Sequence, residues 1–263
     1  MSGRFTSEQL KKIAMGTMFL DHAAVAVIYR HGLDDMSPLL EHIGLAMRLV
    51  GRMAFPLYAF LLVQGFLWTR DWKKYASRMV LFALLAEIPY DLVLSGRIWY
   101  PQAQNTIWTL TVGLICLKML DVIGQKYQLL WSMTAVSQRS SERDFSTLFI
   151  GYVLTAWVLA VSMAAAAALR CDYGAWGLFL IVLLYLFRYN PALLPAAGMA
   201  GVLVIYGFST YVFFAWIAIF FISRYNGERG RRMGYLPYVF YPAHLLFVWI
   251  AGELIATGLA AGI

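Results

Sequence analysis

The sequence predicts an all-α fold, a polytopic bundle of about nine transmembrane helices (range about 8 to 10). Composition is the first observation: 61% of the 263 residues are hydrophobic, 13% are charged and the mean hydropathy is +0.67. An average soluble domain is about 45–50% apolar and 25% charged. The second is that apolar segments recur at lengths near the ~20 residues that cross a bilayer core. Since the connections are short, residues 1–263 are expected to form one integral membrane domain.

The expected spans follow one another with few polar interruptions. The first follows Lys11-Lys12, as a signal peptide would, but Asp21-His22 interrupts its apolar core and more spans follow, so we expect a retained helix. Residues 34–51 are amphipathic and are expected to lie at an interface or to re-enter, and residues 124–145, rich in Gln, Ser and charge, are expected to be the main cytoplasmic loop. The predicted spans are 11–30, 52–69, 76–95, 104–122, 147–169, 174–189, 191–208, 210–223 and 236–258.

The net charge of +7 is explained by topology better than by nucleic-acid binding, because Lys and Arg fall in loops between spans. The largest basic clusters are residues 70–78 and 224–232. The positive-inside rule places both in the cytoplasm. An odd number of spans then gives a cytoplasmic N-terminus and an external C-terminus, as expected for a multi-pass protein of a bacterial inner membrane.

Two histidines lie inside long apolar segments, where an ionisable side chain is costly. His22 is in the middle of the first span, and His244 is in the last, within Tyr-Pro-Ala-His-Leu. Insertion-based scales put a charge at the bilayer centre at about +2.5 to +3.5 kcal/mol. A buried neutral imidazole can accept a proton near pH 7, which suits general acid and base catalysis. Both are therefore catalytic candidates, and a hydrogen bond to a neighbouring helix is the structural alternative.

Three basic residues accompany His22. Lys11 precedes it by eleven residues, so both side chains share a helix face about 16 Å apart along the axis. Such a line suits a phosphate-bearing ligand that is anchored at the membrane surface and reacts within the bundle. Arg48 and Arg52 also share a face, and guanidinium groups match carboxylate and phosphate oxygens well. Snorkelling to the interface is the alternative for Lys11 and Arg48.

Three carboxylates in the predicted spans are expected to have supporting roles. Asp21 points about 100° away from His22, so it is expected to bind another helix rather than to orient the imidazole. Glu87 and Asp91 are four residues apart and flank Pro89. We expect a structural ion pair there, with Arg52 as a candidate partner, and a polar track is the alternative.

Polar residues also mark two helix starts. Asn105 and Thr109 share a face of the fourth span and are expected to bond a neighbouring helix. Asp172 precedes the sixth span and is expected to cap it, because an acid there favours the helix dipole. Cys116 and Cys171 form no metal-binding pattern, and no metal is expected.

The residues alone leave two classes of protein open. The chain contains no Gly-x-Ser-x-Gly motif, P-loop or dinucleotide fingerprint. A membrane enzyme that uses acid and base catalysis is one class. The other is a proton-coupled transporter with a polar track through the bundle. The residues of that track would be His22, Glu87, Asp91 and His244.

Six segments, taken in order, resemble the TraX family, which is named for the acetylation of conjugative pilin. The resemblance runs from near residue 11 to residue 250. The segments are KKIAMGTMFLDH (11–22), GRMAFPLYAFLLVQGF (51–66), residues 75–91 ending in AEIPYD, QNTIWTLTVGL (104–114), DYGAWGLFLIVLLY (172–185) and FYPAHLL (240–246).

TraX proteins are similar to the wider transmembrane acyltransferase group. In that group a basic residue about eleven positions before a first-helix histidine, and arginines nearby, are associated with acyl-CoA. The resemblance implies donor binding by Lys11, Arg48 and Arg52. It implies catalysis by His22 and Arg52, and His244 matches the C-terminal motif, which also contains Tyr241. The group's arginines are often spaced Arg-x-x-Arg, whereas three residues separate Arg48 from Arg52 here.

The resemblance also implies the substrates. Acetyl-CoA is the expected acyl donor, and the N-terminal amine of a pilin-type protein is the first choice of acceptor. The alternatives are O-acetylation of a surface glycan or lipid-linked sugar, the transporter above, and a non-enzymatic membrane assembly factor that tolerates loss of His22. Membrane lipids are expected around the spans, and nucleic acid is not an expected partner.

Overall fold

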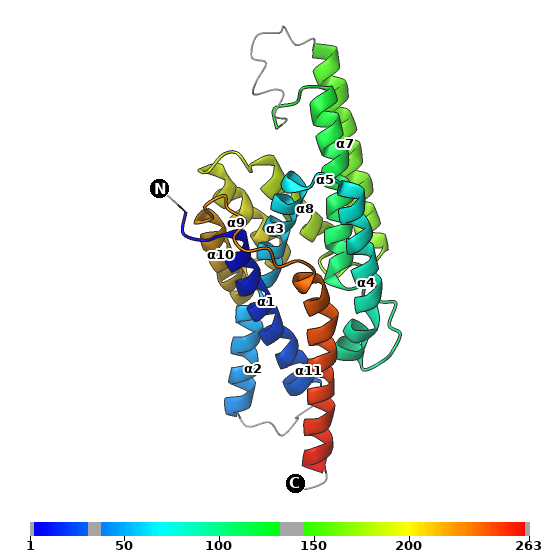
Figure 1. Ribbon diagram of the computed structural model, residues 1–263, viewed down its shortest axis with the longest axis vertical. Coiled ribbons are helices and arrows are strands. Elements are labelled where there is room, and N and C mark those ends of the chain that lie inside the picture. Colours follow the sequence, from blue (N-terminus) through cyan, green and yellow to red (C-terminus); the bar gives the residue numbers. More distant parts are fainter. Residues whose placement is uncertain (1–2, 31–37, 132–144, 261–263) are drawn as a thin grey trace.

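The computed structural model describes residues 3–30, 38–131 and 145–260, which form an elongated bundle of helices (Figure 1). Within these ranges the extended contacts are two single-residue bridges, Phe5 with Tyr225 and Gln104 with Cys171. The predicted all-α class is therefore confirmed.

The first helix carries His22 and changes its geometry directly after it. α1 (Ser7–Ala23) begins with a capping box and continues into the π-helical turn η1 (Ala24–Tyr29). Arg30 follows this turn and pairs with Glu253 near the other end of the chain, with 2.8 Å between Nη2 and Oε1. π-helical turns inside α-helices are frequent at functional sites.

Short connections join the remaining helices. A side-chain cap from Asp71 starts α4, and Gly96 ends it at φ +73°, a left-handed conformation that glycine adopts without strain. Pro89 lies inside this helix. The helices are α2 (Pro38–Gly51), α3 (Ala54–Trp68), α4 (Trp72–Ser95), α5 (Thr106–Lys126), α7 (Phe145–Ala168), α8 (Gly174–Leu186), α9 (Leu193–Tyr206), α10 (Thr210–Ser223) and α11 (Leu236–Ala260).

Every predicted span overlaps one of these helices. α8, α9 and α10 are shorter, with 13, 14 and 14 residues, where the sequence showed short and poorly separated spans. Helix α5 extends to Lys126, into the predicted loop 124–145, and residues 132–144 of that loop lie outside the described residues, as do residues 34–37 of the amphipathic segment. Five segments are long and apolar enough to cross a membrane: Ser7–Tyr29, Pro38–Trp68, Thr106–Lys126, Phe145–Ala168 and Leu236–Gly258.

The basic segments gather at one end of the bundle. The backbone N–H groups of Arg4 and Phe5 donate to the carbonyl of Arg224 at 2.7 and 3.1 Å, and the Arg229 guanidinium donates to the carbonyl of Trp68 at 3.0 Å. Residues 70–78 directly follow Trp68, so both basic clusters and the start of α1 share this end, named here the basic end. From there α11 runs beside α1 to the opposite end (Figure 1).

Candidate active site

A cavity of about 780 Å³, named here the basic cavity, lies at the basic end. Its deeper wall is apolar and includes Leu61, Leu62 and Leu110. Among the described residues that line it, none is Asp or Glu, so its positive charge is not balanced within the lining. A cleft of one charge sign focuses the field and attracts ligands of the opposite sign. The cationic lining residues are Lys11, Arg70, Arg78, Arg229, Arg231 and Arg232.

A second cavity of about 370 Å³ continues from the first and is named here the histidine cavity. Met18, Tyr58 and Thr106 line both cavities, so the two meet at these residues. His22 lines the second cavity, whereas Lys11 lines the first. The face of α1 that Lys11 and His22 were predicted to share therefore borders both cavities, with Lys11 at the basic cavity and His22 at the histidine cavity.

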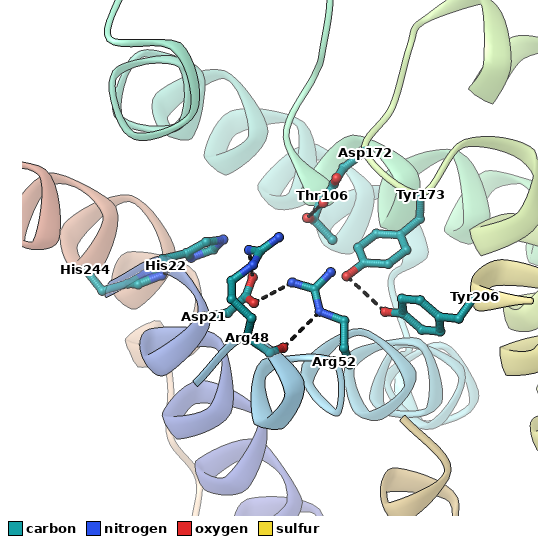
Figure 2. Close-up of polar contacts among 9 residues, drawn as sticks. All are labelled: Asp21, His22, Arg48, Arg52, Thr106, Asp172, Tyr173, Tyr206 and His244. Carbon is teal, nitrogen blue, oxygen red and sulfur yellow. Dashed lines mark hydrogen bonds and ion pairs between the residues drawn. The ribbon is translucent and has the colours of Figure 1, made fainter. Parts of the chain in front are cut away.

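Asp21 holds both predicted arginines in the histidine cavity (Figure 2). Its Oδ2 accepts from Arg48 Nη1 at 2.9 Å, and its Oδ1 accepts from Arg52 Nη2. Arg52 Nε also donates to the backbone carbonyl of Arg48 at 3.2 Å. The prediction that Asp21 binds another helix is confirmed. Asp172 lines the same cavity, so its two guanidinium groups face two carboxylates, of which Asp21 bonds both arginines.

His22 and His244 meet across the bundle, although 222 residues separate them in the chain (Figure 2). The Nδ1 atom of His244 lies 2.8 Å from the carbonyl oxygen of Phe240, which only accepts, so this nitrogen carries the proton. The lone pair of His244 is then on Nε2, 2.7 Å from His22 Nδ1, which must donate to it. The hydrogen-bond network thus assigns His22 a free lone pair on Nε2, the arrangement of a general base.

Tyr58 and Tyr241 lie where the two cavities meet. The Tyr241 ring stands edge-on to both imidazoles, with centroids 6.2 Å from His22 and 5.6 Å from His244. Both phenol oxygens are buried, and neither has a hydrogen-bond partner among the described residues. Tyr241 was predicted as a supporting residue, and Tyr58 was missed, because a tyrosine inside the apolar motif FPLYAF gives no sign that its hydroxyl is unpaired.

An aromatic wall closes the histidine cavity on the side away from the histidines. Tyr173 stacks on Phe55 with ring centroids 3.6 Å apart, and its hydroxyl lies 3.5 Å from that of Tyr206 (Figure 2). Asp172 lies next to this wall and accepts from the Thr106 hydroxyl at 2.6 Å. The predicted capping role of Asp172 is wrong: the cap position of α8 is Tyr173, and it makes no side-chain capping bond. The short connection instead turns the carboxylate toward α5.

The predicted ion pair of Glu87 and Asp91 is also wrong. Glu87 accepts from the Asn105 amide and, at 3.1 Å, from the Trp108 indole, while Asp91 accepts from the backbone N–H of Tyr100 at 2.8 Å. Arg52 is bound to Asp21 instead. Asn105 also donates to the carbonyl of Ala83 at 2.8 Å, so its predicted bond to a neighbouring helix is confirmed.

The two cysteines are not proposed as part of this site, either as nucleophiles or as metal ligands. Cys116 and Cys171 are free and buried, and burial raises the pKa of the Cys171 thiol to about 11. Cys171 is therefore protonated at neutral pH and is a poor nucleophile. Among the described residues, no three His, Cys, Asp or Glu side chains are grouped so that they could hold a metal ion.

Gly51 lets α2 approach Asp21 closely, and Gly51→Ala is expected to lower stability. An added Cβ would lie within 2.7 Å of Asp21 Cγ, so the carboxylate would have to leave the arginines. Overpacking of this kind costs about 1–3 kcal/mol. Gly16→Ala on α1 is the control, because a Cβ there meets nothing within 4 Å. Thermal unfolding of both variants in detergent checks the prediction, and equal melting temperatures would contradict it.

The fold and the cavities define a polytopic helical membrane protein with an internal polar site that is reached from a cationic mouth. The TraX protein family model matches residues 6–251, and the chain belongs to the TraX family. The chain is also similar to a probable fimbrial assembly protein, FimC of serogroup H1, from Dichelobacter nodosus. The two are 29% identical over 252 residues, which cover 92% of this chain and 93% of the relative. No solved structure matches the chain.

Proposed function

We propose that this protein is a membrane acyltransferase that moves an acetyl group from acetyl-CoA to the N-terminal amine of a pilin-type protein. The observation that carries the proposal is the pair of joined cavities: a cationic mouth leads through an apolar passage to a free imidazole lone pair. Coenzyme A has the matching shape and charge, a phosphate-rich nucleotide with a long neutral arm that ends in the thioester. Lys11, Arg229, Arg231 and Arg232 would hold the phosphates, in agreement with the predicted role of Lys11.

His22 is the proposed general base. Acetyl-CoA supplies an activated acyl group and a thiolate leaving group. His22 Nε2 removes a proton from the acceptor nitrogen as that nitrogen forms its bond to the acyl carbon, and it returns the proton to the sulfur as the carbon–sulfur bond breaks. His244 holds His22 in the required tautomer through its Nε2. The positive charge of Arg48 and Arg52 favours the negative charge that develops in the same cavity.

The acceptor side of the histidine cavity suits an amine. Asp172 offers a carboxylate that accepts from the neutral Thr106 hydroxyl, and Tyr173, Trp176 and Tyr206 line the same cavity. Carboxylates and aromatic faces both attract an ammonium group. The family and the fimbrial relative support a pilin-type acceptor. Aromatic rings also stack on sugars, so O-acetylation of a surface glycan is the second candidate.

The proposed location is a bacterial inner membrane with the basic end in the cytoplasm, as the positive-inside rule requires. The N-terminal segment then lies inside, α11 ends outside, and the donor enters from the compartment where acetyl-CoA is made. The transporter alternative loses support, because Glu87 and Asp91 bind donors of their own rather than continuing a track from the histidines. That alternative predicts ion-dependent uptake in proteoliposomes without acetyl-CoA turnover.

Acetyl-CoA binding and transfer by detergent-purified protein test the proposal. Arg231→Gln with Arg232→Gln is expected to weaken acetyl-CoA binding about tenfold, since two partly solvated phosphate contacts are worth about 1.4 kcal/mol together. High salt should reduce the difference. The control, Lys73→Gln with Lys74→Gln, removes equal charge at the same end but outside the cavity lining.

The measurement is acetyl-CoA titration, with CoA release in the presence of a peptide that has a free N-terminal amine. Wild-type protein that neither binds acetyl-CoA nor releases CoA would refute the proposal. Equal weakening in the control pair would show a general charge effect and would contradict the assignment of the mouth.

A further inference from the structure

We propose that the hydroxyl groups of Tyr58 and Tyr241 bind the carbonyl oxygen of the acyl thioester and stabilise the negative charge it acquires. This inference rests on the proposed function and gives the carbonyl oxygen of the donor its own hydrogen-bond donors, apart from the predicted catalytic residues His22 and Arg52. It starts from two buried hydrogen-bond donors that have no partner within the described ranges of the chain. Buried polar groups are nearly always satisfied, so a pair of exceptions in one place requires an explanation.

The position of the two phenols supports this explanation. Tyr58 lines both cavities, and Tyr241 lines the basic cavity through which the acyl donor would enter. Tyr241 also packs edge-on against His22, so its ring borders the proposed base. The two phenols come from α3 and α11, and both of these helices pack against α1. A carbonyl that reaches His22 from the basic cavity must pass this junction.

The contacts of Arg52 explain why it is the weaker candidate for this bond. Its Nη2 donates to Asp21 and its Nε donates to the carbonyl of Arg48, so two of its donor atoms are already engaged in the protein. A donor that is free before the reaction loses no existing bond when it receives the oxyanion. Arg52 therefore contributes charge, whereas the tyrosines contribute directed hydrogen bonds.

The chemistry of the step is balanced without another reactant. The acceptor nitrogen forms its bond to the acyl carbon while His22 Nε2 takes one of its protons. Electrons of the carbonyl double bond move onto the oxygen, which accepts hydrogen bonds from Tyr58 and Tyr241. When the double bond re-forms, the carbon–sulfur bond breaks and the sulfur receives the proton from His22. The tyrosines keep their own protons throughout.

Tyr58→Phe and Tyr241→Phe test the inference, because each removes a hydroxyl that has no hydrogen-bond partner among the residues that the structure describes. Each variant is expected to lower kcat about 10²-fold or more, the effect of losing one oxyanion donor, with KM for acetyl-CoA changed less than about threefold. Their melting temperatures should equal or exceed that of the wild type, since an unsatisfied buried group is removed. The assay is the release of CoA with an amine-terminated peptide as acceptor.

Tyr225→Phe is the matched control. The Tyr225 hydroxyl is also buried and has no partner in the described part of the chain, but the residue lines neither cavity. Its kcat should stay at the wild-type value, and its melting temperature should equal or exceed that of the wild type for the same reason. Unchanged kcat in both Tyr58→Phe and Tyr241→Phe, or a loss accompanied by a lower melting temperature, would overturn the inference. If the proposed function itself is wrong, the wild type fails to turn over acetyl-CoA or His22→Ala retains full turnover, results that the tyrosine variants do not affect.

Discussion

Replacing His22 with alanine is expected to lower acetyl transfer by about 10²–10⁴-fold, the usual contribution of a positioned general base. The reason is that His22 lines the cavity and its Nε2 lone pair has no partner among the described residues, while His244 is engaged at both nitrogens. Acetyl-CoA binding should change little, because the cationic residues proposed to hold its phosphates line the basic cavity and His22 does not. Steady-state kinetics and acetyl-CoA titration of purified protein separate the two effects.

Two further histidine variants make this prediction specific. His42→Ala is the control, since His42 is exposed on α2 and bonds the carbonyl of Pro38 within the same helix. It should keep wild-type turnover. His244→Ala should lose activity because His22 Nδ1 no longer has its acceptor, and His244→Gln, which can offer a carbonyl oxygen, should lose less. Full turnover in His22→Ala would refute the base assignment.

Asp21→Ala is expected to lower the free energy of unfolding by about 3–5 kcal/mol, the cost of breaking a buried ion pair on one side. The carboxylate is 13% exposed and faces Arg48 and Arg52, which are 29% and 15% exposed. Removing it leaves two guanidinium groups side by side with no carboxylate between them. The cavity admits some water to Arg48, so the lower figure is expected. Thermal unfolding in detergent, followed by circular dichroism, measures the loss.

Asp121→Asn provides the comparison for this prediction. Asp121 pairs with one cation, Lys118, at 3.3 Å, and the two side chains are 23% and 30% exposed. Its loss should lower the melting temperature much less than the loss of Asp21. If the two variants unfold at the same temperature, Asp21 does not have the bridging role that the geometry gives it.

The fold class could be predicted because membrane insertion depends on a local property, the number of consecutive apolar residues. The helices therefore appear where apolar segments were found, and they are short where those segments were short. Helix ends were less predictable. α5 continues to Lys126, into a stretch whose polarity suggested a loop, because packing and capping decide where a helix stops.

The sequence could show which residues belong to the candidate site, but it could not show which of them bind one another. His22, Arg48 and Arg52 were chosen because their side chains are costly in lipid, and all three line one cavity. The partners could not be assigned in the same way. Glu87 and Asp91 were paired with a cation on the basis of charge, yet their buried carboxylates are bonded to an amide, an indole and a backbone N–H. Because donors of this kind are neutral, the pattern of charges in a sequence does not reveal which carboxylate they bond.

The amino-acid sequence alone predicts a helical membrane protein whose basic segments favour one end and whose apolar helices contain a few ionisable residues. The packed helices add that His22 meets His244, that Asp21 holds both arginines, and that two cavities join at Tyr58. Helix positions follow from local hydrophobicity, whereas hydrogen bonds and cavities depend on how distant helices pack. The bond between two imidazoles 222 residues apart is a property of that packing.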